Sequence, residues 1–411
     1  MRRSRIKSPF INRKLPILVF LLLFLSLFFW RVFSYLPIQT DGYLKVRSTL
    51  LEEPKEYGKW QYFSLDVYRV KANSEHELNY GDILLIEGEV TKSRFTDPKI
   101  RVAGTSTWRK ILFNIREGLR EKIFEYFSEP QASLLAGITL GSKEDLPESF
   151  KDSLIQTGTI HVVVVSGYNI SVVAGFLVGL SKFIKRQYAT IFALLVIVFY
   201  TLLVGAEPPA VRAAIMGSVA FAAITLGRQR LPLYSLILAA LLMTVISPIV
   251  VTEVGFQLSF LATAGIILFQ KQLLNFLSFL PKPFSEDLST TLAAQSLVVP
   301  VIFYHFGSVS AISPVANATT LWTIPIATVL GFLFIAASFT LPFFAQILSW
   351  VVWSFLFIFT SLVEVFSKLP ITSFEFEPKQ ILPISVYYGV LVLAVYYFKY
   401  VRKAKAKQSK S

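Results

Sequence analysis

The chain has 411 residues, of which 54% are hydrophobic and 16% charged, whereas soluble domains carry about 25% charged residues. This composition argues against one large soluble core and predicts a polytopic α-helical membrane protein with about ten spanning or re-entrant helices. The net charge of +14 fits Lys and Arg in cytoplasmic loops, and it would also suit a polyanionic substrate. Because there is no cysteine and the three histidines are far apart in sequence, we expect no metal site and no cofactor.

Residues 1–36 begin with a basic segment, and the apolar run 15–30 follows it. No small-residue cleavage site comes after this run, while Arg31 and Tyr35 have the character of interfacial anchors. We therefore expect an uncleaved first transmembrane helix with its N-terminus in the cytoplasm.

Residues 40–105 consist of short segments that alternate in polarity, contain many β-branched residues and are separated by Gly, Pro and Asn. This pattern is typical of a small all-β domain, and the stretch YGDILLIEGEV at 80–90 predicts a turn followed by a strand. The pattern favours an inserted OB-like domain. Residues 106–157 are expected to form amphipathic and linker helices, and 107–127 would lie on a membrane surface or pack on the β domain, with the surface favoured.

Residues 158–370 are predicted to form the membrane domain, and 371–411 the last transmembrane helix and a basic tail. Even numbers of spans leave the basic loops on the side of both termini, so we expect both termini in the cytoplasm and the β domain outside. The spanning or re-entrant candidates cover about 160–180, 188–204, 210–227, 233–248, 254–270, 289–306, 315–340, 345–366 and 382–399, in addition to the first helix.

Polar residues interrupt the apolar stretch HVVVVSGYNIS at 161–171. His161, Ser166 and Asn169 lie within about a 140° arc of a helix, and Gly167 would permit a helix break, as in discontinuous transporter helices. Ordinary helix packing through small and polar side chains is the alternative. From this stretch alone, both interpretations stay open.

Arg212 follows Pro208 and Pro209 in the first turn of an expected helix, near the outer membrane face. Its guanidinium could bind a phosphate, or its side chain could simply reach towards water. Further along the chain, Glu253 and Gln257 form an i, i+4 pair, and Ser259 follows. An interior glutamate would indicate function, whereas a glutamate at the helix mouth would not.

The segment 298–325 contains several prolines and predicts a broken helix with a polar interior or a wet turn. His305 and Asn317 are its candidate functional residues, although His305 could equally be interfacial.

Three long strings in this order resemble the core signature of the ComEC family of competence DNA-uptake channels. They are SLLAGITLGSKEDLPESFKDSLIQTGTIHVVVVSGYNISVVAGF (133–176), PPAVRAAIMGSVAFAAITLGRQRLPLYSLILAALLMTVISP (208–248) and VGFQLSFLATAGIILF (254–269). With the preceding β domain, the resemblance covers about residues 40–370.

The resemblance implies a permease, not an enzyme, that passes single-stranded DNA through the cytoplasmic (inner) membrane of a bacterium in natural transformation. It also implies an external DNA receptor and a cytoplasmic ATP-driven motor, since the chain has no GxxxxGK[ST] motif. Many members continue into a metallo-β-lactamase-like nuclease domain, whereas this sequence ends at Ser411, so we expect a separate nuclease.

The positions that match the family strings are His161, Ser166, Gly167, Arg212, Gln257 and Ser259, and Asn169 stands where many members have His. With the polar residues of the other spans, the predicted channel or pore residues are His161, Ser166, Gly167, Asn169, Arg212, Glu253, Gln257, Ser259, His305 and Asn317.

Single-stranded DNA needs a basic path and stacking surfaces, and the β domain is rich in both residue types. Aromatic residues at alternate strand positions are also typical of a β-barrel core, so both interpretations stay open. The candidate DNA contacts are Trp60, Tyr62, Arg69, Lys71, Lys92, Arg94 and Arg101.

Two other functions compete with the channel. Ser166 and His305 could form the Ser–His dyad of an intramembrane protease, although Val164 stands where a GxS-type turn would place Gly. The same fold could instead transport another substrate or assist envelope assembly.

Overall fold

The computed structural model describes residues 26–31, 33, 42–50, 54–57, 59–65, 68–73, 78, 81–91, 94–142, 146–163, 169–170, 172, 186–225, 227, 231–369, 373–375, 384–391 and 393. The chain forms two compact units. The first comprises residues 1–113 and 237–253, and it contains the β domain (42–105). The second, called the helical unit, comprises residues 114–236 and 254–411.

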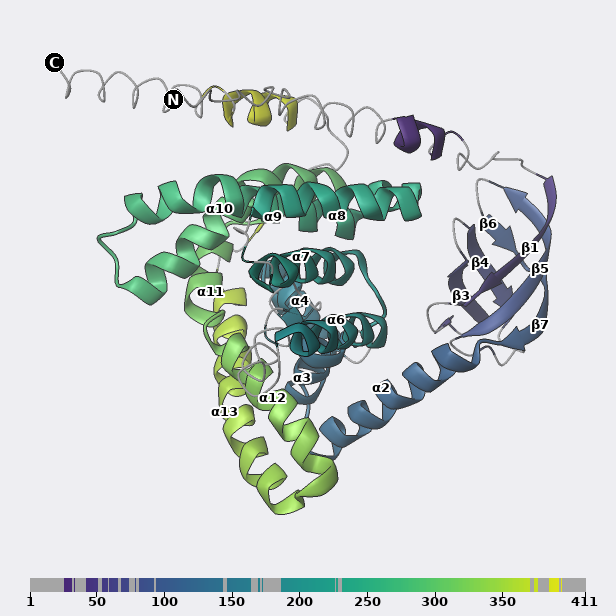
Figure 1. Ribbon diagram of the computed structural model, residues 1–411, viewed down its shortest axis with the longest axis horizontal. Helices are drawn as coiled ribbons and strands as arrows, with labels where there is room; N and C mark the ends of the chain where they lie inside the picture. The colour runs from purple at the N-terminus through teal and green to yellow at the C-terminus, as the bar shows by residue number, and fades with distance from the viewer. Residues whose placement is uncertain are drawn as a thin grey trace, which may run out of the picture. The chain divides into compact units, whose positions relative to one another are not determined.

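The β domain is a seven-stranded sheet (Figure 1) in the order β1-β5-β6-β4-β3-β2, with β7 paired to β5. All strand pairs are antiparallel except β4 with β6. This arrangement confirms the predicted small OB-like β domain. The strands are β1 (Gly42–Thr49), β2 (Lys55–Tyr57), β3 (Trp60–Leu65), β4 (Tyr68–Asn73), β5 (Asp82–Thr91), β6 (Arg94–Thr96) and β7 (Lys99–Thr105).

One face of this sheet is buried because alternate residues of a strand point to opposite sides. In β3, Phe63 and Leu65 enter the core, and in β5 Leu84 and Ile86 do the same. Burying each such side chain stabilises the domain by about 1.5–3 kcal/mol. The predicted turn before β5 is present at Gly81, whose φ of +86° favours glycine, and the predicted strand follows it.

The helical unit contains a fully buried helix and several long apolar ones. α3 (Gln131–Leu140) has all ten residues buried, and it packs against α12 (Thr323–Thr340) and α13 (Pro342–Ser367), which lie side by side (Figure 1). The other elements are α4 (Glu148–Gln156), the 3-10 helix η1 (Ile160–Val162), α6 (Arg186–Leu203), α7 (Pro208–Thr225), α9 (Val254–Phe276), α10 (Lys282–Phe306), β8 (Ser308–Ser310), α11 (Ser313–Thr320) and β9 (Ser373–Glu375). β8 pairs with β9, and residues 384–391 are helical.

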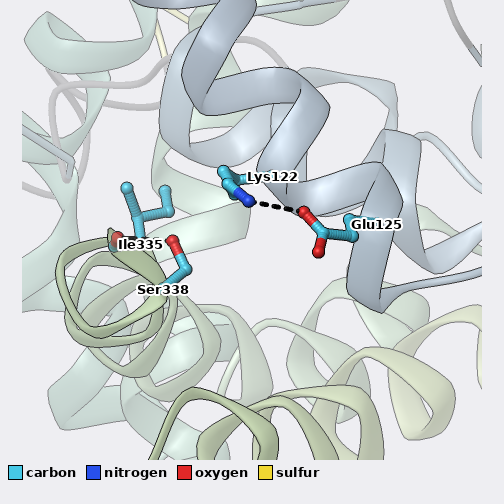
Figure 2. A network of polar contacts seen from close by, with 4 residues as sticks. All are labelled: Lys122, Glu125, Ile335 and Ser338. Carbon is cyan, nitrogen blue, oxygen red and sulfur yellow. Dashed lines mark hydrogen bonds and ion pairs between the residues drawn. The ribbon is translucent and has the colours of Figure 1, made fainter. Parts of the chain in front are cut away.

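Two elements have residues in both units. α8 (Pro232–Ile246) is followed by η2 (Pro248–Thr252), and α2 (Thr107–Tyr126) leads out of the β domain. The last turn of α2 enters the core of the helical unit, where the rings of Tyr126 and Phe127 both meet Phe334 edge to face. Figure 2 shows the Lys122–Glu125 ion pair of α2 near the turn of α12 where the Ser338 hydroxyl donates to the Ile335 carbonyl. The sequence did not predict this packing of α2 on other helices.

Four helices in the described part of the chain are long and apolar enough to cross a membrane, and the prediction of a polytopic membrane protein is confirmed. They are α9, α12, α13 and the part of α10 over Phe284–Phe306. Four shorter apolar helices cover Gln131–Leu140, Tyr188–Leu203, Pro208–Ala223 and Pro232–Ile246.

The candidate over 315–340 is not one continuous helix, because the chain forms α11 and then α12, with Leu321 and Trp322 between them. The breaks after α10 and after α11 agree with the broken helix predicted for 298–325. The expected spans at 15–30 and 160–180 lie largely outside the described residues, so the total of about ten stays a prediction.

Candidate functional site

Four predicted site residues meet in two contacts around the beginning of α9. Nε of Arg212 on α7 donates to Oγ of Ser259 at 2.5 Å. Nε2 of His305 on α10 lies 3.0 Å from Oε1 of Gln257, and since this oxygen only accepts, the imidazole donates. We call Arg212, Gln257, Ser259 and His305 the α9 polar cluster. They come from the first two turns of α7 and α9 and the last turn of α10, so they lie near one end of each of these three helices.

The Arg212 guanidinium has only neutral partners in the described part of the chain. Besides the Ser259 hydroxyl, its Nη1 lies 3.7 Å from Sδ of Met216, one helical turn further along α7. The side chain is half-buried within apolar helices, where a charge without a counter-charge is costly. An anion at this position would remove that cost. Met216 was missed in the sequence, although its i, i+4 spacing from Arg212 could have indicated it.

The helix ends beside Arg212 also favour an anion. α7 and α9 begin side by side, since a Cβ on Gly255 would lie 3.8 Å from Cδ of Pro209. Helix N-termini carry partial positive charge, so two of them add to the field of the guanidinium. Glu253, the residue before α9, is exposed, and its backbone N–H bonds to the Val250 carbonyl. This placement agrees with a glutamate at the helix mouth, and its predicted role in the channel stays a prediction.

Asn169 closes the end of a buried helix. Its Nδ2 donates to the Ile138 carbonyl at 2.6 Å, and the Tyr200 hydroxyl donates to the neighbouring Thr139 carbonyl at 2.8 Å. Both carbonyls belong to the last turn of α3, which has no intrahelical donors for them. With only 2% of its surface exposed, Asn169 has the contacts of a packing residue, which was the alternative interpretation. No pattern in the sequence indicated Tyr200.

His161 lies in η1 with its side chain exposed, and its Nδ1 is 3.1 Å from the Gly158 carbonyl. Ser166 and Gly167, which were predicted to form a helix break after it, lie outside the described residues. The described contact of His305 is with Gln257, so the Ser166–His305 dyad stays an untested prediction.

Asn317 is buried in a small polar network on α10 and α11. Its Nδ2 donates to Oγ of Ser313 at 3.1 Å, and Nε2 of Gln295 donates to the same oxygen at 2.7 Å. Its own Oδ1 has no hydrogen-bond partner. The site prediction for Asn317 therefore falls on a buried polar residue. Among the residues that the structure describes, no three His, Asp or Glu side chains gather where they could hold a metal ion.

In the β domain, two aromatic candidates lie on the outer face of the sheet. Phe63 enters the core, whereas Trp60 and Tyr62 point the other way, and Tyr62 is 39% exposed. Nζ of Lys71 stacks over both rings, at 4.2 Å from the Trp60 centroid and 6.0 Å from that of Tyr62. The interpretation as barrel core is therefore wrong for Trp60 and Tyr62 and right for Phe63.

Arg69 on β4 pairs in register with Arg94 on the parallel strand β6, and both side chains are exposed. These residues extend the surface beside Lys71, and we call the set Trp60, Tyr62, Arg69, Lys71 and Arg94 the outer β face. Arg101 is exposed on β7, which pairs with β5 and not with β4 or β6, and Lys92 lies outside the described residues.

Comparisons with known proteins place the chain in a family. Residues 138–400 match the family model described as competence protein. Over 186 residues the chain is 26% identical to "ComE operon protein 3" of Bacillus subtilis (strain 168). The matched residues make up 45% of this chain and 24% of that protein. Over 161 residues it is 34% identical to an uncharacterized protein of Aquifex aeolicus (strain VF5), and the matched residues make up 38% of each chain.

The matched part spans well under two thirds of the length of either relative, and no solved structure matches the chain. The family model covers more than half of the chain, including the whole α9 polar cluster. The chain therefore belongs to the competence protein family.

Proposed function

We propose that this protein is a membrane channel that carries single-stranded DNA into the cytoplasm during natural transformation. Membership of the competence protein family supports a role in DNA uptake. The observation that carries the proposal is Arg212, a cation among apolar helices with only neutral partners and two helix N-termini beside it. Each passing phosphate would supply the missing negative charge, and a chain of phosphates would supply it repeatedly.

The outer β face supports a single strand rather than a duplex as the cargo. Trp60 and Tyr62 present rings on which unpaired bases can stack, and Lys71, Arg69 and Arg94 provide charge for the backbone. Base stacking on an aromatic side chain contributes about 1–3 kcal/mol per base and does not depend on sequence. In our proposal the β domain lies outside the membrane and holds the strand before entry.

The remaining components follow from the same proposal. The protein would be a multi-pass protein of the cytoplasmic (inner) membrane with both termini in the cytoplasm, and it would act as a permease without chemistry of its own. An external DNA receptor, a separate nuclease and a cytoplasmic ATP-driven motor would act with it. His161, Ser166, Gly167, Asn169, Glu253 and Asn317 stay predicted channel residues.

Entry of labelled DNA tests this function directly. In a strain that lacks the protein, we would restore the wild-type chain or Arg212→Gln and record DNA bound at the surface and DNA in the cytoplasm separately. We expect Arg212→Gln to reduce entry at least about tenfold, a difference of ~1.4 kcal/mol, while surface binding persists. Arg120→Gln is the matched control, because Arg120 pairs with Glu117 at 3.0 Å on α2.

If entry proceeds normally in the strain without the protein, the DNA channel is excluded, and transport of another substrate becomes the better explanation. If DNA entry needs the protein, but the Arg212→Gln variant supports entry as well as the wild type does, the role in DNA uptake stands and Arg212 is not the phosphate contact.

A further inference from the structure

A proline interrupts the hydrogen bonding of α10 six residues before its end. Pro300 lies inside this helix and has no N–H, so the Ser296 carbonyl loses its helical donor. The proline ring also clashes with the Ser296 carbonyl and kinks the helix at this turn, to which the Leu297 carbonyl also belongs. Unsatisfied carbonyls are costly among apolar helices, because no water replaces the lost donor.

Two consecutive tyrosines supply donors to these two consecutive carbonyls. The Tyr387 hydroxyl donates to the Ser296 carbonyl at 3.2 Å, and the Tyr388 hydroxyl donates to the Leu297 carbonyl at 2.8 Å. They come from the helical stretch 384–391, which lies 91 residues further along the chain. The Ser296 hydroxyl bonds elsewhere, to the Ala293 carbonyl.

The part of α10 beyond Pro300 carries His305. This short segment ends at Gly307, whose φ of +67° closes the helix. The imidazole of His305 bonds to Gln257. A helix weakened at Pro300 would let the segment swing, and the contact with Gln257 at 3.0 Å would loosen. The two tyrosines act at the point where such a movement would start.

We propose that Tyr387 and Tyr388 are positioning residues that close the proline break in α10 and thereby place His305 against Gln257. The helical stretch 384–391 would then hold His305 in place through its described contacts with Ser296 and Leu297. This inference concerns the folded protein and does not depend on DNA being the substrate.

A double-mutant cycle with Pro300 tests the first step. Pro300→Ala restores the missing N–H, so the tyrosine hydroxyls should lose their importance in that background. We expect Tyr387→Phe with Tyr388→Phe to lower the thermal unfolding midpoint by about 2 to 4 °C in the wild-type background and by less than about 1 °C with Pro300→Ala. Tyr234→Phe is the control, since Tyr234 is a 63% exposed tyrosine of another apolar helix.

Thiol labelling tests the second step in the same purified full-length protein. The chain has no cysteine, so Ile302→Cys, at a half-buried position of α10 beyond Pro300, creates a single reactive group. We expect the two Tyr→Phe changes to raise its alkylation rate about threefold or more, because the end of α10 opens more often, and Pro300→Ala to reverse the increase.

Equal losses of stability in both Pro300 backgrounds would overturn the proposal, because the tyrosines would then act elsewhere. An alkylation rate that stays unchanged would overturn the link to His305. Neither measurement involves DNA, so failure here is distinguishable from failure of the DNA channel.

Discussion

Most of the polar candidate residues point outward in the β domain, whereas most of those in the helical unit point inward. In the sheet, backbone groups pair with neighbouring strands, so Lys71, Arg69 and Arg94 remain available on the outer β face. In the helical unit, helix ends and a proline leave carbonyls without helical donors inside apolar surroundings, and Asn169, Tyr200 and Tyr387 donate to them. The difference suggests that polar residues mark binding surfaces in the first region but more often internal structure in the second.

Arg212 is the exception that this comparison isolates. It points inward, but it satisfies no carbonyl among its described contacts, which are with a hydroxyl and a thioether sulfur. A polar residue of the helical unit that does not donate to an unpaired carbonyl is a better functional candidate than one that does. For this reason, the proposed channel contact is Arg212 rather than Asn169.

The largest expected effect comes from removing an inward donor. Asn169→Ala leaves the Ile138 carbonyl buried without a partner, which should cost about 1–3 kcal/mol of stability. Thermal unfolding of the detergent-solubilised protein measures this, with Asn114→Ala at an exposed position of α2 as the control. If both variants unfold like wild type, the inward polar residues are not needed for structure and the comparison fails.

A smaller effect is expected from an outward residue, and it should appear in binding rather than in stability. Trp60→Ala removes the ring under Lys71 and one stacking surface, so the affinity of the full-length protein for a labelled oligothymidylate should fall about fivefold or more. Fluorescence anisotropy measures the affinity, and Tyr43→Ala, a 66% exposed aromatic residue on β1, is the control. Similar losses in both variants would show that exposed aromatic residues bind the strand without a defined site.

The smallest effect concerns an outward ion pair between β1 and β5. The hydrogen bond from Lys45 holds the pKa of Glu87 below its usual value of 4.5, with smaller contributions from Arg101 and Lys99. A depressed pKa stabilises the folded form above pH 4.5, and this contribution is lost as the pH falls through the lowered value. Glu87→Gln should therefore slightly flatten the loss of stability between about pH 5 and 3, because exposed pairs contribute little. Thermal unfolding measured at a series of pH values checks this. If the midpoint of Glu87→Gln changes with pH as steeply as that of the wild type, the ion pair does not contribute.

The sequence predicted the β domain well because its signals are local. The turn at Gly81 and the strand β5 follow from residues next to one another. The side of the sheet on which Trp60 and Tyr62 lie did not follow, because β3 has large apolar residues in both alternating sets. Gln61 is buried in the set of Phe63 and Leu65, which makes the inner set look less apolar than it is.

In the helical unit, the partners of the predicted polar residues were not predictable. Arg212 contacts a residue 47 positions away, His305 one 48 away and Tyr200 one 61 away, and no local pattern encodes such pairs. The position of the break between α11 and α12 was not predicted within 298–325, because Leu321 and Trp322 continue the apolar run, although Asn317, Thr319 and Thr320 precede them.

The complete burial of α3 has a consequence for how the protein folds during its synthesis. Ten residues make a helix about 15 Å long, half the thickness of the hydrocarbon layer, so α3 has no stable place in lipid by itself. Its partners α12 and α13 begin about 180 and 200 residues later in the chain. At roughly 5–20 residues per second, α3 must wait about 10 to 40 seconds after its own synthesis before its surroundings exist. Until then, the translocation machinery or the helices made earlier must cover α3. A ribosome that stalls before α12 would leave a nascent chain in which the core around α3 is incomplete.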